Sequence, residues 1–198
     1  MQNNLFMIIN YIGLFIASII RKIFTRGQRQ ESIRDDRIST AERVLTPLPL
    51  LGMLILPLIY TFTDWLDFAN YTLPDWAGWL GVGVYLVFLW LLYRSHVDLG
   101  RNWSPSLQVR QEHSLVTQGV FRYMRHPMYS AHLVWGLAQP LLLHNWIAGF
   151  SLLISQLPLY IARIPREEKM MLENFGDEYR TYMKRTGSVF PAFWKSGR

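Results

Sequence analysis

A short run of ionisable and aromatic residues lies at the start of a long apolar stretch. Arg125, His126 and Pro127 occur together, and Tyr129 follows two residues later. Pro127 stands where a helix is expected to begin, a position at which its missing N–H is tolerated. A guanidinium, an imidazole and a phenol at one helix start can bind an anion or move a proton. On position alone, the alternative is an interfacial cluster that contacts lipid headgroups.

A second charged segment lies at the far end of the next apolar stretch. It contains Arg163, Glu167 and Glu168. Only residues 144 and 145 separate the two stretches, so we expect an antiparallel hairpin in which this segment lies beside the first cluster. The two carboxylates would then find basic and tyrosyl partners across one narrow gap. Adjacent helical residues point about 100° apart, so we expect only one glutamate to reach the gap directly.

Simpler interpretations exist for some of these residues. Arg163 and Glu167 are four residues apart on one helix face, so their pairing can be purely structural. A metal site is not expected, because His126 and His132 are six residues apart and the chain has no cysteine. We expect His96 to lie on a cytoplasmic loop as an ordinary interfacial residue.

The composition indicates a membrane protein. Of the 198 residues, 51% are apolar and 17% are charged, and several apolar runs approach the length of a membrane span. We expect five spans, the first a retained helix rather than a cleaved signal peptide. The absence of cysteine excludes a disulfide framework and a thiolate nucleophile. The expected spans cover about residues 4–23, 44–62, 77–93, 128–143 and 146–164.

All basic residues fall on one side of this arrangement. Residues 21–43 carry seven Lys or Arg, residues 94–127 carry five and residues 163–198 carry eight, which together make all 20. Residues 64–75 carry three Asp and no basic residue. The positive-inside rule therefore predicts an outside N-terminus and a cytoplasmic C-terminus, in the cell inner (plasma) membrane. Because the basic residues gather at one face of the membrane, the net charge of +6 does not require a nucleic-acid partner.

The remaining segments complete the expected all-α membrane fold. Residues 24–43 are expected to form a solvated cytoplasmic loop, with at most a short interfacial helix. Apolar and aromatic residues recur at three- and four-residue spacing over residues 166–185, which predicts an amphipathic helix on the cytoplasmic face. Residues 187–194 are expected to form a docked tail. Prolines in the second, fourth and fifth spans predict kinks that open a cavity.

The order and spacing of these motifs resemble the C-terminal core of the isoprenylcysteine carboxyl methyltransferase family, with a wider likeness to phospholipid methyltransferases. The resemblance covers roughly residues 96–193 and implies an integral membrane methyltransferase that uses S-adenosylmethionine without a Rossmann domain. We therefore expect N-terminal transmembrane helices over residues 1–95 and a methyltransferase core over residues 96–198, with the hairpin at 128–164. The motifs that carry the resemblance are Gly119-x-Phe121, Arg125-His126-Pro127-x-Tyr129, Glu167-Glu168 and Phe175-Gly176-x-Glu178-Tyr179.

The resemblance also implies roles for individual residues. An acceptor carboxylate would be anchored by Arg163 or Arg125, whereas an amine or thiol acceptor would need a base such as His126 or Glu168. The catalytic candidates are accordingly Arg163, Glu168 and His126. Ala131 departs from the family pattern, which often has Gly there. The implied cofactor-binding residues are Gly119, Tyr123, Arg125, His126, Pro127, Tyr129 and Glu167.

These residues do not determine the methyl acceptor, which can be a small molecule or a lipid, or the oligomeric state. Membrane lipids are expected partners, because a gap between kinked helices opens sideways to the bilayer. The competing hypothesis is a non-catalytic membrane protein. In that case the Arg/His/Glu cluster would bind anionic lipid or a protein partner at the cytoplasmic face.

Overall fold

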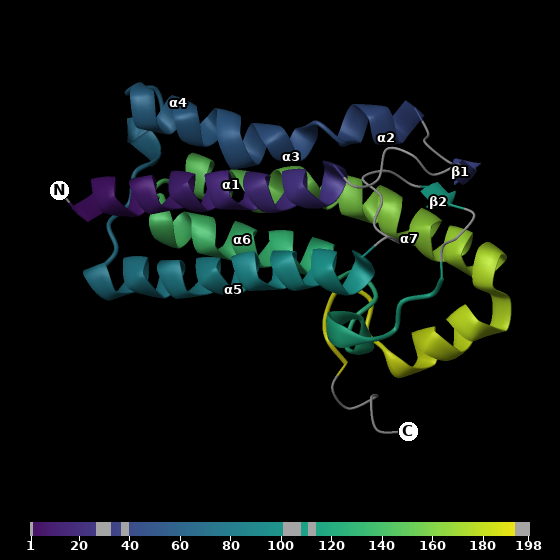
Figure 1. Cartoon of the computed structure of the whole chain (residues 1–198). Coiled ribbons are helices and arrows are strands. Elements are labelled where there is room, and N and C mark those ends of the chain that lie inside the picture. The colour runs from purple at the N-terminus through teal and green to yellow at the C-terminus, as the bar shows by residue number, and fades with distance from the viewer. Residues whose placement is uncertain (1, 27–32, 37–39, 101–107, 111–113, 193–198) are drawn as a thin grey trace.

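Long helices that lie along one common axis make up most of the computed structural model (Figure 1), which describes residues 2–26, 33–36, 40–100, 108–110 and 114–192. Short elements gather at the two ends of these helices. The order of elements is α1 (Gln2–Arg26), β1 (Ile33–Asp36), α2 (Thr40–Leu45), α3 (Leu48–Leu50), the π-helical turn η1 (Leu51–Ile55), α4 (Leu56–Phe62), the 3₁₀ turn η2 (Asp67–Ala69), α5 (Asp75–Leu99), β2 (Gln108–Arg110), the 3₁₀ turn η4 (Gly119–Arg122), α6 (Pro127–Leu142) and α7 (Trp146–Arg185).

Four helical segments in the described part of the chain are long and apolar enough to cross a membrane. They are Asn4–Thr25, Arg43–Phe62, Asp75–Leu99 and Trp146–Arg185. Large apolar side chains such as Phe15, Leu86 and Ile161 remain exposed on these helices, as expected for surfaces that face lipid. The predicted integral membrane character is therefore confirmed. Helix α6 has 16 residues and is shorter than the roughly 20 that cross the hydrocarbon core straight.

Helices α6 and α7 form the predicted tight hairpin. Helix α6 begins at Pro127, with His126 as its N-cap residue, and ends at Leu142. Helix α7 begins after three connecting residues. Its start is capped by the Asn145 side chain, which accepts hydrogen bonds from the free backbone N–H groups of Ile147 and Ala148. The same side chain donates to a backbone oxygen of the segment before α5, which fixes the hairpin turn at one end of the molecule.

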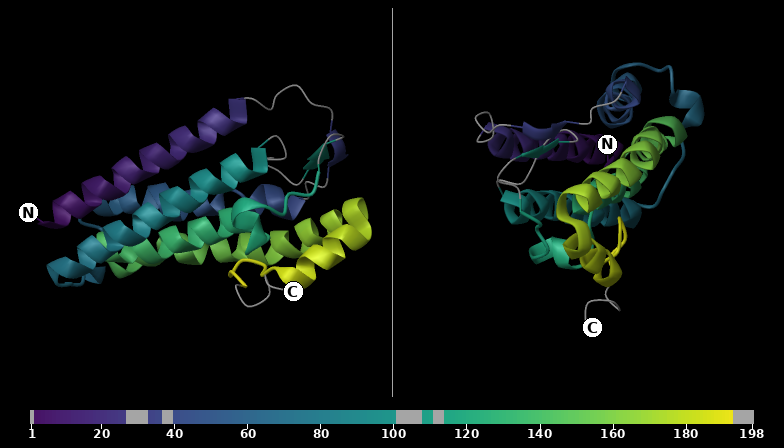
Figure 2. Two further views of the ribbon diagram at one scale, coloured as in Figure 1. Left: turned by 60° about the horizontal axis from the view of Figure 1, so that its bottom comes forward. Right: turned by 90° about the vertical axis from the view of Figure 1, so that its right-hand side faces the viewer.

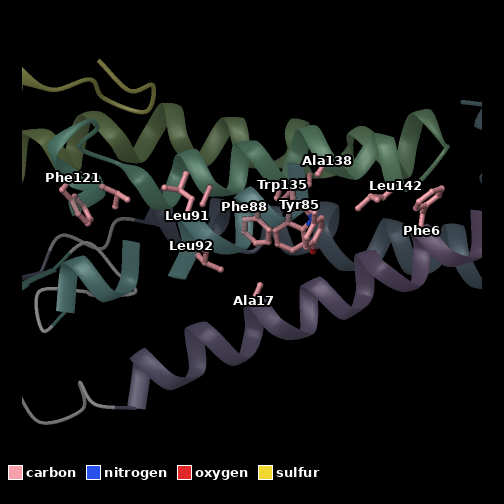
Figure 3. Close-up of a cluster of buried hydrophobic side chains, with 13 residues drawn as sticks. Phe6, Ala17, Tyr85, Phe88, Leu91, Leu92, Phe121, Trp135, Ala138 and Leu142 are labelled. Atoms are coloured by element: carbon pink, nitrogen blue, oxygen red, sulfur yellow. The ribbon is translucent and has the colours of Figure 1, made fainter. Parts of the chain in front are cut away.

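The core of the molecule lies between α1, α5 and α6 (Figure 3). Phe88 of α5 and Trp135 of α6 stack with ring centroids 4.8 Å apart, and Tyr85 meets Trp135 edge to face. Phe6 and Ala17 of α1 close this cluster from the other side. Because the cluster is buried and aromatic, it holds the start of α6 at a fixed height beside the end of α5.

The second span is broken by a π-helical turn between Pro49 and Pro57. Such a turn frees backbone carbonyl groups from the regular helix pattern. The Gly52 oxygen accepts hydrogen bonds from Gln139 of α6 at 3.0 Å and Ser151 of α7 at 2.7 Å. The neighbouring helices therefore satisfy the distorted backbone, as lipid cannot.

The fold is mostly helical, as expected, and contains one short sheet that was not expected. Strands β1 and β2 pair in an antiparallel two-stranded sheet that connects the loop after α1 to the loop after α5. Helix α1 also continues to Arg26, and α2 begins at Thr40, so the predicted loop over 24–43 is shorter at both ends. Apart from β1, the rest of that loop lies outside the described residues.

The fifth span continues without a break into the region of the predicted amphipathic helix, as far as Gly176. Helix α7 runs from Trp146 past Pro165, although a separate helix over 166–185 was expected. The direction of the chain changes instead at Gly176, whose φ of 53° and ψ of −125° suit a residue without a Cβ. The last turns of α7 then run back toward the start of α6 (Figure 2). At about 1.5 Å per residue, the stretch from Trp146 to Phe175 reaches about 45 Å, which is longer than the roughly 30 Å hydrocarbon core, so its last turns project beyond the core.

The tail after α7 docks on the segment that precedes α6. Met124 and Gly187 form a parallel β-bridge, beside which Gly187 N donates to Tyr123 O at 3.1 Å. The Arg125 and His126 N–H groups both donate to Ser188 O at 3.1 Å. The predicted docked tail is thus observed up to residue 192, and residues 193 and 194 lie outside the described residues.

Candidate active site

The loop that carries the Arg-His-Pro motif is held on the end of α5. The Val120 N–H donates to the Asp98 carboxylate at 2.8 Å, and Asp98 also pairs with Arg94 at 2.6 Å. Gly119 makes this approach possible, because it has a φ of 60° and a Cβ there would lie 2.1 Å from the Asp98 carboxylate. The resemblance implied cofactor binding at Gly119; in the structure, the Asp98 carboxylate occupies the space beside this residue.

His126 lies between the two adjacent glutamates of α7. Its Nδ1 is 3.3 Å from Glu167 Oε2, and its Nε2 is 3.2 Å from Glu168 Oε1. Burial opposes the charged form of the imidazole, but the hydrogen bonds to both carboxylates outweigh it, so the pKa of His126 is raised from its ordinary value. The favoured form is therefore an imidazolium that donates to one carboxylate from each nitrogen.

Glu167 belongs to a group of residues that faces a cavity. Its Oε1 accepts a hydrogen bond from the Tyr129 hydroxyl at 2.6 Å and pairs with Arg163 Nε at 2.8 Å. The Tyr129 ring stacks on His126 and lies 4.6 Å from the ring centre of Tyr160. A carboxylate, a guanidinium and two aromatic faces therefore meet at one wall.

Glu168 faces the docked tail instead. Its Oε1 accepts from Arg125 Nε at 2.9 Å, from Arg125 Nη2 at 2.8 Å and from the Ser188 hydroxyl at 3.2 Å. The remaining guanidinium nitrogen of Arg125 donates to the Thr186 oxygen at 2.9 Å. This second pair therefore ties α6, α7 and the tail together.

A cavity of about 250 Å³ opens beside the first of these groups. Residues from α1, the second span, α5, α6 and α7 contribute to it, so its walls come from the whole bundle. The kinked second span supplies Pro49 and Met53, which agrees with the expectation that prolines would open a cavity. The lining residues are Arg21, Thr46, Pro49, Met53, Leu92, His96, Leu99, Phe121, Arg125, His126, Pro127, Met128, Tyr129, His132, Leu159, Tyr160, Arg163 and Glu167.

Six of the nine predicted site residues line this cavity, namely Arg125, His126, Pro127, Tyr129, Arg163 and Glu167. The other three, Gly119, Tyr123 and Glu168, contribute to the support of the loop and tail. Of the two glutamates, Glu167 is the one that reaches the cavity, as the geometry of adjacent helical residues requires. Ala131 is fully buried in the core cluster.

Four cavity residues were missed or misplaced by sequence reasoning. His96 was expected on a loop, but it lies in the last turn of α5 and is 1% exposed. Arg21, His132 and Tyr160 carry no motif that points to the site. The only signal for His132 and Tyr160 is their helical spacing of three residues from Tyr129 and Arg163, which puts each pair on a similar face. Across the described ranges, no group of three His, Cys, Asp or Glu has the geometry of a metal site.

The fold and the site define a helical integral membrane protein with a charged cavity at one end of its helices. Residues 80–173 match the model of the isoprenylcysteine carboxyl methyltransferase (ICMT) family. The match covers just under half of the chain, and it confirms the resemblance to this family that the motifs predicted.

Individual relatives agree with this relationship. The chain is 34% identical over 97 residues to protein-S-isoprenylcysteine O-methyltransferase B of Arabidopsis thaliana, which is 48% of this chain and 49% of that protein. Protein-S-isoprenylcysteine O-methyltransferase A of the same plant is 25% identical over 187 residues, covering 93% of this chain and 91% of that protein. The chain thus spans about half the length of the first relative and nearly all of the second.

A solved structure shares the fold. The structure of the eukaryotic intramembrane Ras methyltransferase ICMT (isoprenylcysteine carboxyl methyltransferase) superposes with a TM-score of 0.56 at 24% identity, over 80% of this chain and 55% of that one. At this level of identity, the likeness supports the helical membrane fold and nothing beyond the fold.

Proposed function

We propose that the chain is an integral membrane methyltransferase that uses S-adenosylmethionine. The observation that carries the proposal is the cavity beside Glu167, whose polar wall is made by the Arg-His-Pro-x-Tyr motif and by Arg163. Both wall segments lie within the residues that match the family model. The relatives bear names that describe O-methylation of isoprenylcysteine, which supports the same activity here.

The residues of the wall suit the chemical groups of this cofactor. Glu167 presents a carboxylate that can accept from hydroxyl or amino groups, and Arg163 can neutralise a carboxylate. The faces of Tyr129 and Tyr160 can lie against a sulfonium cation. We assign cofactor binding to these residues with His126 and Pro127, and we assign support of the loop and tail to Gly119, Tyr123, Arg125 and Glu168.

The acceptor is proposed to be the carboxylate of a prenylated cysteine, the group named in the relatives. When bound, the cofactor supplies a methyl group on sulfur, and transfer to a carboxylate oxygen forms a C–O bond, breaks a C–S bond and moves no proton. The catalytic tasks left for this chain are therefore alignment and exclusion of water. His126 and Glu168 are not needed as bases, and apolar residues such as Met53 and Leu159 offer a surface for the lipid.

The proposed topology has five spans, with the short α6 as the fourth. The three basic segments, which carry all 20 Lys and Arg, then lie on one side, and we assign that side to the cytoplasm with an outside N-terminus in the plasma membrane. The division between residues 1–95 and 96–198 is proposed as a functional one. It does not separate two folding units, because α5 crosses it and packs on α6 through Phe88 and Trp135.

A transfer assay tests the proposed activity. Purified protein in detergent would be incubated with radiolabelled S-adenosylmethionine and a panel of acceptors: a prenylated cysteine, a phospholipid amine and a small thiol. We expect label in the base-labile methyl ester of the prenylated cysteine. A thermal unfolding transition would show that the protein is folded. If such protein labelled no acceptor, the result would favour the non-catalytic hypothesis of lipid or partner binding.

A further inference from the structure

Arg21 places a charge at the cavity that the family motifs do not explain. It lies in the last two turns of α1, well before residues 80–173, and lines the cavity. Its charge acts on Tyr160 and Arg163 of α7 and on His132 of α6, all of which also line the cavity. The guanidinium is therefore directed at the cavity rather than away from it, even though Arg21 stays exposed at its mouth.

The charges of the site are unequal. Arg163 pairs with Glu167 and Arg125 pairs with Glu168, while the imidazolium between them contacts both carboxylates. No carboxylate of the described ranges lies within ion-pair distance of Arg21. The cluster thus has four cationic groups and two carboxylates. Such an excess of positive charge beside a partly apolar cavity favours an anionic ligand. The cations are Arg21, Arg125, His126 and Arg163, and the carboxylates are Glu167 and Glu168.

The other arginines are committed to protein partners. All three guanidinium nitrogens of Arg125 donate within the protein, to Glu168 and to backbone oxygens of the tail. Arg163 uses its Nε for Glu167, which holds it at the wall assigned to the cofactor. Unlike Arg125 and Arg163, Arg21 therefore has a guanidinium that can bind a ligand other than the cofactor.

We propose that Arg21 is a specificity-determining residue that binds the anionic group of the methyl acceptor. This inference rests on the proposed function and adds α1 to the acceptor site. The cavity places Pro49 and Met53 of the kinked second span among the same lining residues, so one site offers both a cation for a carboxylate and an apolar wall for a lipid chain. The assignment replaces the expectation that Arg163 or Arg125 anchors the acceptor carboxylate.

Kinetics of Arg21→Gln against N-acetyl-S-farnesylcysteine test this assignment. We expect KM for this acceptor to rise about 10- to 100-fold, the usual effect of losing a hydrogen bond between charged groups. The kcat and the affinity for S-adenosylhomocysteine, the demethylated cofactor, should not change. Arg21→Lys should recover part of the loss. Lys22→Gln, the same change at the exposed neighbouring residue outside the cavity lining, should behave as wild type.

The carboxamide of the same acceptor separates charge recognition from packing. It cannot be methylated on oxygen, and its Ki as a competitive inhibitor should be the same for wild type and Arg21→Gln. An unchanged KM in Arg21→Gln, an equal rise in KM and in the carboxamide Ki, or loss of S-adenosylhomocysteine binding would each overturn the inference. Absence of cofactor binding and transfer in the wild type would instead overturn the proposed function, so the two failures are distinguishable.

Discussion

Glu167 and Glu168 are neighbours in sequence, and each contacts one nitrogen of His126 and pairs with an arginine, yet they face different parts of the molecule. Glu167 lines the cavity with Tyr129 and Arg163. Glu168 holds Arg125 and Ser188 and so joins the tail to the helices. One charged cluster therefore contains a binding half and a supporting half, and mutations in the two halves should fail in different ways.

The largest expected effect is on the binding half. Glu167→Gln leaves the Arg163 and His126 cations without their carboxylate, so we expect methyl transfer to fall at least about 100-fold, equivalent to roughly 3 kcal/mol. The measurement is transfer of label from S-adenosylmethionine at saturating acceptor. Glu173→Gln is the matched control on the same helix, because its pair with Lys169 is exposed and long at 3.9 Å. Equal activity of wild type and Glu167→Gln would contradict the assignment.

The supporting half should fail through stability. Glu168→Gln leaves Arg125 with a neutral partner, and we expect the free energy of unfolding to fall by about 2–3 kcal/mol. Thermal unfolding in detergent, with limited proteolysis of the tail, would measure this change. Cofactor affinity of the molecules that remain folded should be retained. If Glu168→Gln instead lost cofactor binding at unchanged stability, the division into two halves would be wrong.

A smaller effect is expected where the loop meets α5. Gly119→Ala places a Cβ against the Asp98 carboxylate at a φ of 60°, and we expect a loss of about 1–2 kcal/mol of stability. Gly83→Ala is the control, since a Cβ at Gly83 meets no atom within 4 Å. Chemical unfolding of both variants would compare them. Equal stabilities would show that the Asp98 contact does not constrain the loop.

The smallest effect is a pH dependence that both halves share through His126. Because the pKa of His126 is raised in the folded protein, its contribution to stability is fully present below its ordinary pKa of 6.5 and is lost as the pH rises through the raised value. We expect the free energy of unfolding to fall by about 1 kcal/mol from mildly acidic to mildly alkaline pH. Melting curves across this range, repeated for His126→Asn, would measure it. If the stability of the wild type and of His126→Asn changed equally with pH, His126 would be excluded as the origin of the pH dependence.

Local patterns were sufficient to predict the membrane-spanning character of the chain, the hairpin and the facing motifs. Hydropathy identifies a span without knowledge of its neighbours, and a connection of two or three residues leaves α6 and α7 no arrangement except side by side. The same connection places His126 opposite Glu167 and Glu168. The spacing of the motifs was therefore sufficient to predict most of the residues of the candidate site.

The missed features depend on contacts between distant parts of the chain. The sheet pairs Ile33 with Arg110, and neither strand is long enough to show a pattern of its own. Arg21 reaches the cavity because α1 packs on α5 through Phe6 and Ala17, which sets the rotation of α1. The fifth span was expected to end at residue 164, whereas α7 continues past Pro165 and the chain reverses at Gly176.

Equilibrium binding of S-adenosylmethionine to purified protein in detergent tests the central claim most directly. Titration calorimetry would follow wild type and Glu167→Gln, with S-adenosylhomocysteine as a second ligand and thermal unfolding as the check that both are folded. The account predicts saturable binding of both ligands by the wild type and its loss in Glu167→Gln. A folded wild-type protein that binds neither ligand would contradict it.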